Sequence, residues 1–274
     1  MEKTSIERQK KLQKFWGNKF QDKNRYQNIL PYVHSQPPFY TNGNFVTLDG
    51  MDFFLTQAPV DIGEFHDLVF WLMPLQIIQV SSFVESGRLK ANRYVPLVEG
   101  ESTQFLHEGR QANVLFNQVF GTKIADFGVK TFQTGKNIRV QAENFFETEF
   151  YRKVDLVYEK IDFKAKIDFY QFYNWIDQEI AQFDQVFELC EKILEIDGLK
   201  MIHCSAGVGR STAFAICALI MKQNRCKKIS GWRDLSPSIY EMVEHFRVQR
   251  NPMCIQTVQQ FKFLFEFADY VAQQ

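Results

Sequence analysis

One short segment constrains this chain more than any other, because it places a strand, a glycine-containing loop and a helix in immediate succession. Residues Lys200–His203 are predicted to form the strand, and residues 211–223 the helix. Between them, Gly207 and Gly209 allow the backbone angles that a tight path needs. Successive backbone N–H groups of such a loop turn inward, and the positive end of the helix dipole points the same way. The segment therefore predicts an anion site, with a dianionic phosphate as its natural guest.

Two side chains of this loop carry chemistry that the backbone lacks. Arg210 offers a planar fork that can bind two phosphate oxygens at once, and Cys204 stands six positions before it. A thiol with an ordinary pKa near ~8.5 falls to about 3.5–7.5 at a helix N-terminus beside cationic groups. We therefore expect Cys204 to be a thiolate at neutral pH and a nucleophile toward phosphorus. The alternative, a buried structural cysteine, fits Cys190 and Cys217 on their apolar helix faces better.

The composition excludes several other classes of function. The 32 Lys and Arg residues are balanced by 32 Asp and Glu residues, so no global charge attracts nucleic acid or an acidic membrane. The five cysteines lack CxxC pairs, and no His and Cys cluster has the spacing of zinc ligands, so we expect no metal and no cofactor. No apolar run suits a secretion signal or a membrane span. These features predict a cytoplasmic protein with reduced cysteines and no membrane insertion.

Hydrophobic periodicity predicts a mixed α/β domain of the α+β type. Alternating apolar residues between 154 and 169 indicate antiparallel strands in the middle of the chain. Apolar residues with helical spacing indicate helices over 4–20, over 180–198, and over about 236–249 and 257–272. Strands in the middle with helices at both ends favour a curved, mostly mixed β-sheet flanked by helices.

The sequence HCSAGVGRS, residues 203–211, resembles the active-site loop of the protein tyrosine phosphatases, a family with a Cys-x5-Arg signature. The resemblance implies that the hydroxyl of Ser211 eases departure of the thiolate and that His203 helps to organise the loop. It extends to the last helix, which implies a catalytic domain over 23–274 and an N-terminal helix, 1–22, packed on it. By the same resemblance, phosphate binds to Ser205, Ala206, Gly207, Val208, Gly209 and Arg210.

Two further segments carry the resemblance to the tyrosine-specific branch. KNRYQNILPY, residues 23–32, resembles its phosphotyrosine-recognition loop, which implies that Tyr26 stacks on the substrate ring. A tall aromatic wall admits only a long side chain to the nucleophile. Asn28 stands where the family usually has an Asp that binds the substrate main chain, and its amide oxygen still accepts hydrogen bonds. CIQTVQQ, residues 254–260, is similar to the loop that positions the hydrolytic water, which implies that role for Gln256, with Gln260 assisting.

Expulsion of a tyrosine phenolate requires a proton donor near the leaving oxygen. The family carries this carboxyl group in a Trp-Pro-Asp loop, and the similar residues here are Trp175, Ile176 and Asp177, without the proline. The resemblance therefore implies Asp177 as the general acid, with Glu179 in reserve. The alternative role for Asp177 is to cap a helix that begins near position 178. The family carboxylate that braces the arginine has no assigned counterpart, although Glu108 is a candidate.

These features together predict an enzyme, a protein-tyrosine phosphatase that hydrolyses phosphotyrosine through a cysteinyl-phosphate intermediate. Its expected partners are phosphotyrosine-containing proteins, and its expected role is dephosphorylation in signalling. Two alternatives stay open. One is a phosphotyrosine-binding protein with little or no turnover, and the other is a dual-specificity or phosphoinositide phosphatase. The compactness and the loop substitutions also resemble virus-encoded members of the family, such as those of polydnaviruses.

Overall fold

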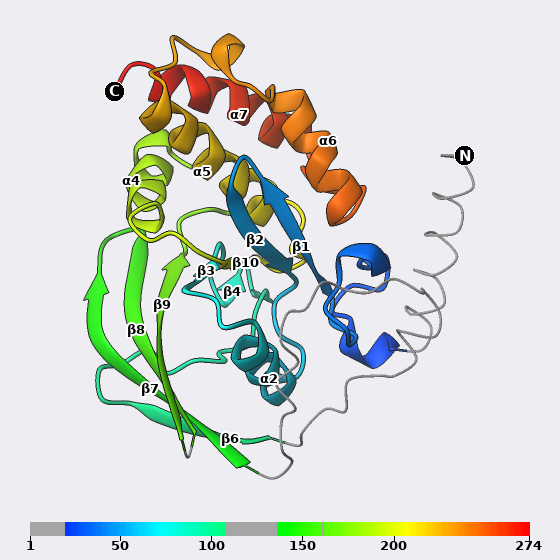
Figure 1. The fold of residues 1–274 in the computed structure, drawn as a ribbon, viewed down its shortest axis with the longest axis vertical. Helices are drawn as coiled ribbons and strands as arrows, with labels where there is room; N and C mark the ends of the chain where they lie inside the picture. Colours follow the sequence, from blue (N-terminus) through cyan, green and yellow to red (C-terminus); the bar gives the residue numbers. More distant parts are fainter. Residues whose placement is uncertain (1–19, 108–135, 161) are drawn as a thin grey trace.

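An eight-stranded mixed sheet forms the centre of the protein (Figure 1). The computed structural model describes residues 20–107, 136–160 and 162–274, so the expected helix over 4–20 lies almost wholly outside the described residues. The strand order is β1-β2-β10-β3-β9-β8-β7-β6. The strands are β1 (Gly43–Leu48), β2 (Met51–Thr56), β3 (Gln76–Gln79), β6 (Ser102–His107), β7 (Lys136–Glu147), β8 (Tyr151–Lys160), β9 (Phe163–Phe172) and β10 (Lys200–His203).

The pairing of these strands confirms the predicted mixed sheet. β10 runs parallel to both β2 and β3, and β3 runs parallel to β9. The other neighbours in the sheet are antiparallel, including the long β7-β8-β9 meander that the alternating residues predicted. A separate two-stranded hairpin consists of β4 (Val84–Glu85) and β5 (Arg88–Leu89).

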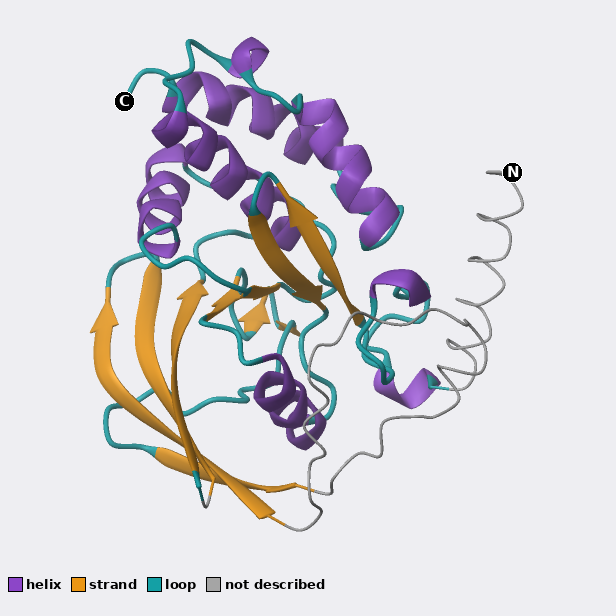
Figure 2. Ribbon diagram, in the orientation of Figure 1, coloured by secondary structure: helices purple, strands orange, loops and turns teal. Residues whose placement is uncertain are grey.

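Helices cover both faces of the sheet (Figure 2). Four of them, together with the sheet residues that face them, form one hydrophobic core, and α2 packs into a second core on the opposite face. The helices are α2 (Ile62–Leu72), α4 (Phe183–Ile193), α5 (Arg210–Cys226), α6 (Ile239–Gln249) and α7 (Val258–Val271), with 3-10 turns at Gln21–Lys23, Val33–Ser35 and Trp232–Asp234. None of the helices in the described part of the chain combines the length and the apolar character that crossing a membrane requires.

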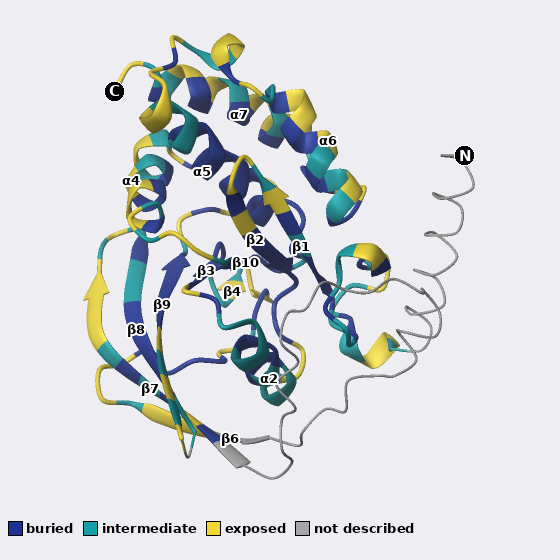
Figure 3. Ribbon diagram, in the orientation of Figure 1, coloured by how far each residue is buried: buried dark blue, intermediate teal, exposed yellow. Residues whose placement is uncertain are grey.

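The central strands β3 and β10 are buried (Figure 3), and successive residues of β10 belong to the two cores in turn. Met201 of β10 faces the α2 side, whereas Ile202 faces the side of α4 to α7, and both are fully buried. On β2, Phe54 and Leu55 divide in the same way. Each such side chain contributes about 1.5–3 kcal/mol of burial free energy, which fixes the register of a strand as short as β10. The residue that follows β10 is therefore held deep between the two layers.

The elements agree in kind with the sequence predictions, and several boundaries differ by one to five residues. β10 has the predicted bounds, and α5 begins one residue earlier than predicted, at Arg210. The helix predicted from position 180 instead begins at Phe183, with Gln182 as its N-cap. Ile180, whose apolar character extended the predicted helix, is 48% exposed and belongs to the preceding loop.

Candidate active site

The loop between β10 and α5 takes its shape from two glycines that no larger residue could replace unchanged. Gly207 has a φ of 71°, and a Cβ atom there would lie 2.1 Å from the carbonyl oxygen of Thr56. A Cβ atom on Gly209 would lie 2.4 Å from Oε1 of Gln256. The backbone thus turns tightly over β2 and past residues 254–260, here called the glutamine loop, as the predicted nest of N–H groups requires.

Cys204 lies at the base of this loop with its side chain almost fully buried, 3% exposed. The N–H group of Gly207 donates a hydrogen bond of 3.3 Å to its sulfur, and the hydroxyl of Ser211 lies 3.7 Å from the same atom. Burial alone would raise the pKa of the thiol. The charge of Arg210 and the N–H groups of Ser211 and Gly207 outweigh burial and lower the pKa of Cys204 below its ordinary value. The sulfur is therefore placed and polarised as a nucleophile.

Arg210 is held rigidly and still has two N–H groups to offer. Its side chain is 1% exposed, and Nη1 donates to Oε1 of Glu85 and to the carbonyl oxygen of Trp175, each at 2.6 Å. Nε and Nη2 have no hydrogen-bond partner within the described residues. A buried guanidinium that is anchored through Nη1 and makes no hydrogen bond through Nε or Nη2 is suited to a bidentate grip on an oxyanion.

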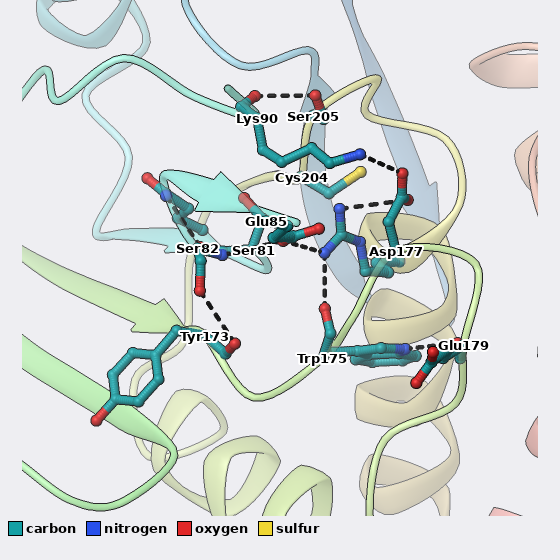
Figure 4. A network of polar contacts seen from close by, with 12 residues as sticks. Ser81, Ser82, Glu85, Lys90, Tyr173, Trp175, Asp177, Glu179, Cys204 and Ser205 are labelled. Atoms are coloured by element: carbon teal, nitrogen blue, oxygen red, sulfur yellow. Dashed lines mark hydrogen bonds and ion pairs between the residues drawn. The ribbon is translucent and has the colours of Figure 1, made fainter. Parts of the chain in front are cut away.

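Asp177 pairs with two cations at the mouth of the site. Its Oδ2 lies 2.6 Å from Nζ of Lys90, and its Oδ1 lies 3.3 Å from Nη2 of Arg210. Figure 4 shows the carboxylate and the Lys90 ammonium on the same side of the loop as the sulfur of Cys204. The capping alternative is wrong, because α4 begins only at Phe183 and Asp177 lies in the loop before it.

A tight turn carries Asp177 although the family proline is absent. The N–H group of Glu179 donates to the carbonyl of Ile176 at 3.2 Å, and Gln178 between them has a φ of 64°. The indole N–H group of the buried Trp175 donates to the carbonyl of Glu179 at 2.9 Å and closes the turn from inside. The contact of Glu179 is thus made by its backbone, whereas the Asp177 carboxylate reaches the site.

His203 is neutral and organises the loop through the backbone. Its Nδ1 donates to the carbonyl of Cys204 at 3.0 Å, so Nε2 accepts from the hydroxyl of Tyr94 at 2.5 Å. Burial lowers the pKa of His203 to about 4. A neutral ring in this position fixes the Cys204 backbone without adding charge.

Tyr26 contacts the loop between β10 and α5, residues 204–209, which we call the phosphate loop. The Ser205 hydroxyl donates to the Lys90 carbonyl at 2.9 Å, so it accepts from the phenol of Tyr26 at 2.8 Å. The aromatic ring therefore stands beside the loop, 179 positions away along the sequence. Asn28 is exposed two residues further on.

The glutamine loop lies against the same phosphate loop. The N–H group of Ile255 donates to the carbonyl of Val208 at 3.0 Å, which ties the two loops together. The N–H group of Gln256 donates to Oε1 of Gln260 at 2.9 Å, and Gln260 is buried with its Nε2 unpartnered among the described residues. Gln256 and Gln260 are thus both brought to Gly209, where the sequence predicted a water-positioning pair.

A second buried arginine supports the loop from behind. Nε of Arg250 donates to the carbonyl of Gly207 at 3.2 Å, Nη1 to Oδ1 of Asn44 at 3.1 Å, and Nη2 to Oδ1 of Asn42 at 2.8 Å. Burial lowers the pKa of Arg250 to about 10, which leaves it protonated at neutral pH. Arg250 therefore ties the Gly207 carbonyl to Asn42 and Asn44.

Comparison with known proteins agrees with this geometry. The family model described as protein-tyrosine phosphatase matches residues 20–269. The chain belongs to this family. Tyrosine-protein phosphatase 1 of Schizosaccharomyces pombe is 26% identical over 270 residues, which cover 90% of this chain and 44% of that protein. Human tyrosine-protein phosphatase non-receptor type 13 is 26% identical over 263 residues, which cover 91% of this chain and 9% of that protein.

This protein-tyrosine phosphatase chain therefore spans less than half the length of either relative. Among solved structures, the Trypanosoma cruzi protein tyrosine phosphatase TcPTP1 matches with a TM-score of 0.74 at 20% identity. The match covers 92% of this chain and 83% of that one, so the two share a fold. The predicted fold class is thereby confirmed, whereas the resemblance to virus-encoded members stays a prediction.

Sequence reasoning about this phosphatase missed three residues of the site. Glu85 braces Arg210, whereas the candidate Glu108 lies outside the described residues. Lys90 pairs with Asp177, and Arg250 supports the loop. Glu85 ends β4 and Lys90 directly follows β5, so the Gly-containing turn of this hairpin was the available signal. Among the residues that the structure describes, no group of His, Cys, Asp and Glu could hold a metal ion.

Proposed function

We propose that this chain hydrolyses phosphotyrosine in proteins through a cysteinyl-phosphate intermediate on Cys204. One observation carries the proposal: a sulfur with a lowered pKa lies close to the buried Arg210, two of whose nitrogens, Nε and Nη2, have no hydrogen-bond partner within the described residues. A phosphate dianion satisfies both groups at once. The family membership supports the same reaction class.

In the first step, the Cys204 thiolate attacks phosphorus, so that a sulfur–phosphorus bond forms while the bond to the tyrosine oxygen breaks. Arg210 and the loop N–H groups bind the oxygens that stay on phosphorus. Asp177, at the mouth of the site, gives its proton to the leaving phenolate. The incoming phosphate competes with the Asp177 carboxylate for Nη2 of Arg210, which frees that carboxyl group for proton transfer.

In the second step, water attacks phosphorus and the sulfur–phosphorus bond breaks. Gln256 and Gln260 orient the water, and Asp177 takes up its proton. The hydroxyl of Ser211, 3.7 Å from the sulfur, donates to the returning thiolate and stabilises it as a leaving group. Inorganic phosphate and the starting enzyme are the products.

The position of Tyr26 supports phosphotyrosine over shorter substrates. Its phenol reaches Ser205 of the phosphate loop, so the ring forms a wall whose height matches an aromatic side chain. Neutral Asn28 at the rim accepts hydrogen bonds from the substrate main chain. Phosphotyrosine-containing proteins are therefore the proposed partners. We also propose that the protein acts in signalling in the cytoplasm, with a catalytic domain over 23–274 and the expected helix over 1–22, which lies almost wholly outside the described residues.

Phosphate release from a phosphotyrosine peptide in the presence of EDTA tests the proposal. Turnover should be lost in Cys204→Ser and kept in Cys226→Ser, a matched change at an exposed cysteine. Tight peptide binding by folded protein without turnover would favour a phosphotyrosine-binding protein instead. Rates on phosphothreonine or phosphoinositide substrates equal to the rate on phosphotyrosine would favour a dual-specificity or phosphoinositide phosphatase.

A further inference from the structure

A closed ring of contacts joins three segments beside the site (Figure 4). The N–H group of Ser82 donates to Oε1 of Glu85 at 3.2 Å, and Arg210 donates to the same oxygen. Arg210 also donates to the carbonyl of Trp175. The hydroxyl of Ser82 donates to the carbonyl of Tyr173 at 3.2 Å and completes the ring.

Tyr173 directly follows β9 and begins the segment that leads to the acid, Asp177. Its N–H group donates to the carbonyl of Phe150 at 3.1 Å, and its phenol donates to the carbonyl of Thr148. Asn174, the next residue, is exposed, and its side chain donates to the half-buried Gln185. The Ser82 hydroxyl therefore acts on the point from which the acid loop departs.

The two carbonyls in the ring, those of Tyr173 and Trp175, are two residues apart. The chain bends between them, at Asn174. Ser82 binds the first carbonyl, Arg210 binds the second, and Glu85 bridges the two donors. The ring thus fixes the stem of the acid loop relative to the guanidinium that binds phosphate, two residues before Asp177.

We propose that Ser82 is a positioning residue for the general acid: through the Tyr173 carbonyl, its hydroxyl sets where Asp177 stands relative to the leaving oxygen. This inference rests on the proposed function. The hydrogen bonds of Ser82 go to Tyr173 and Glu85, so it acts on Asp177 only through these two residues. Loss of its hydroxyl leaves the backbone bond to Glu85 intact and removes only the bond to the stem.

The test compares two leaving groups in single-turnover measurements of phosphoenzyme formation. The phenol of tyrosine, with an ordinary pKa of ~10, needs a proton to depart, whereas a dinitrophenyl phosphate loses its leaving group without one. In Ser82→Ala, the rate on the phosphotyrosine peptide should fall roughly three- to tenfold, as expected for one hydrogen bond. The rate on the dinitrophenyl substrate should stay within about twofold. Ser82→Thr, which keeps the hydroxyl, should restore the first rate.

Ser81→Ala is the matched control, because the neighbouring Ser81 hydroxyl has no hydrogen-bond partner among the described residues. It should leave the ratio of the two rates unchanged. If Ser82→Ala does not fold, Ser82→Cys keeps the shape with a poor donor and should show the same selective loss. An equal loss on both substrates, or none, would overturn the positioning role, whereas an inactive wild-type protein would instead overturn the proposed function.

Discussion

Replacement of Gly207 by alanine should destabilise the protein and disable the nucleophile together. The new Cβ would lie 2.1 Å from the Thr56 carbonyl, a backbone atom that cannot swing aside, at a residue whose φ is 71°. A left-handed backbone costs a non-glycine residue about 1–2 kcal/mol, and overpacking costs about 1–3 kcal/mol. The free energy of unfolding should therefore fall by roughly 2–5 kcal/mol, a loss of about 4–9 °C in Tm for a chain of 274 residues. Displacement of the Gly207 N–H group also removes a donor from Cys204.

Gly209→Ala is the informative comparison, because its clash is with a movable side chain. There the Cβ would lie 2.4 Å from Oε1 of Gln256, and the φ of Gly209 is −87°, outside the left-handed region in which Gly207 lies. Stability should change by less than about 1 kcal/mol once the glutamine swings away. A misplacement of about 1 Å can cost ~100-fold in rate, and here the slowed step is hydrolysis of the phosphocysteine.

The assay is a thermal melt combined with rapid mixing against a nitrophenyl phosphate. Gly209→Ala should release a burst of nitrophenol equal to the enzyme concentration, followed by slow turnover, because phosphoenzyme accumulates. Gly207→Ala should melt early and show no burst. The reasoning fails if Gly207→Ala melts with the wild type, or if Gly209→Ala slows turnover without a burst.

Three further measurements probe the electrostatics of the site. Because the pKa of Cys204 is lowered while burial raises that of Cys190, iodoacetate should alkylate Cys204 and spare Cys190 in a Cys226→Ser variant, which removes the exposed thiol. The rate should already be level with pH at ~8.5, and phosphate should protect Cys204. His203 has its pKa lowered from 6.5 to about 4, so the unfolded chain takes up its proton first as pH falls. The contribution of His203 to the free energy of unfolding should be complete above pH ~6.5 and should decline by up to roughly 3 kcal/mol toward pH 4. Urea unfolding measures this decline, which should be less steep in His203→Asn. Lys90→Met should lower kcat on phosphotyrosine roughly three- to tenfold, because the ion pair with Asp177 is lost. The alkylation rate of Cys204 should not change, and an unchanged kcat would argue against a role for that pair.

Local features of the site could be predicted from the sequence because they lie within one continuous segment. The strand before Cys204, the glycines and Arg210 all follow from neighbouring residues, and β10 has the predicted bounds. The boundary before α4 was wrong because apolar Ile180 continues the helical spacing although its side chain is exposed. Periodicity cannot distinguish an apolar residue in a loop from the first turn of a helix.

The ionic partners could not be predicted, because they depend on strand neighbours. Glu85 lies 125 positions from Arg210, and Lys90 lies 87 positions from Asp177. Only the sheet order, with β3 beside β10, brings the β4-β5 hairpin that follows β3 to the phosphate loop. No local propensity encodes that order, so a carboxylate and an ammonium that are ordinary in the sequence become parts of the site only after folding.

The support that Arg250 gives has a consequence for transplanting this anion site. Each peptide plane that turns its N–H group toward the guest turns its oxygen the other way, into the protein. At Gly207 that oxygen is met by Arg250, itself held by Asn42 and Asn44 from β1 and the chain before it. If only the nine residues 203–211 were grafted onto another strand–helix junction, the Gly207 carbonyl would be left without a hydrogen-bond donor. A working graft must carry the distant guanidinium as well.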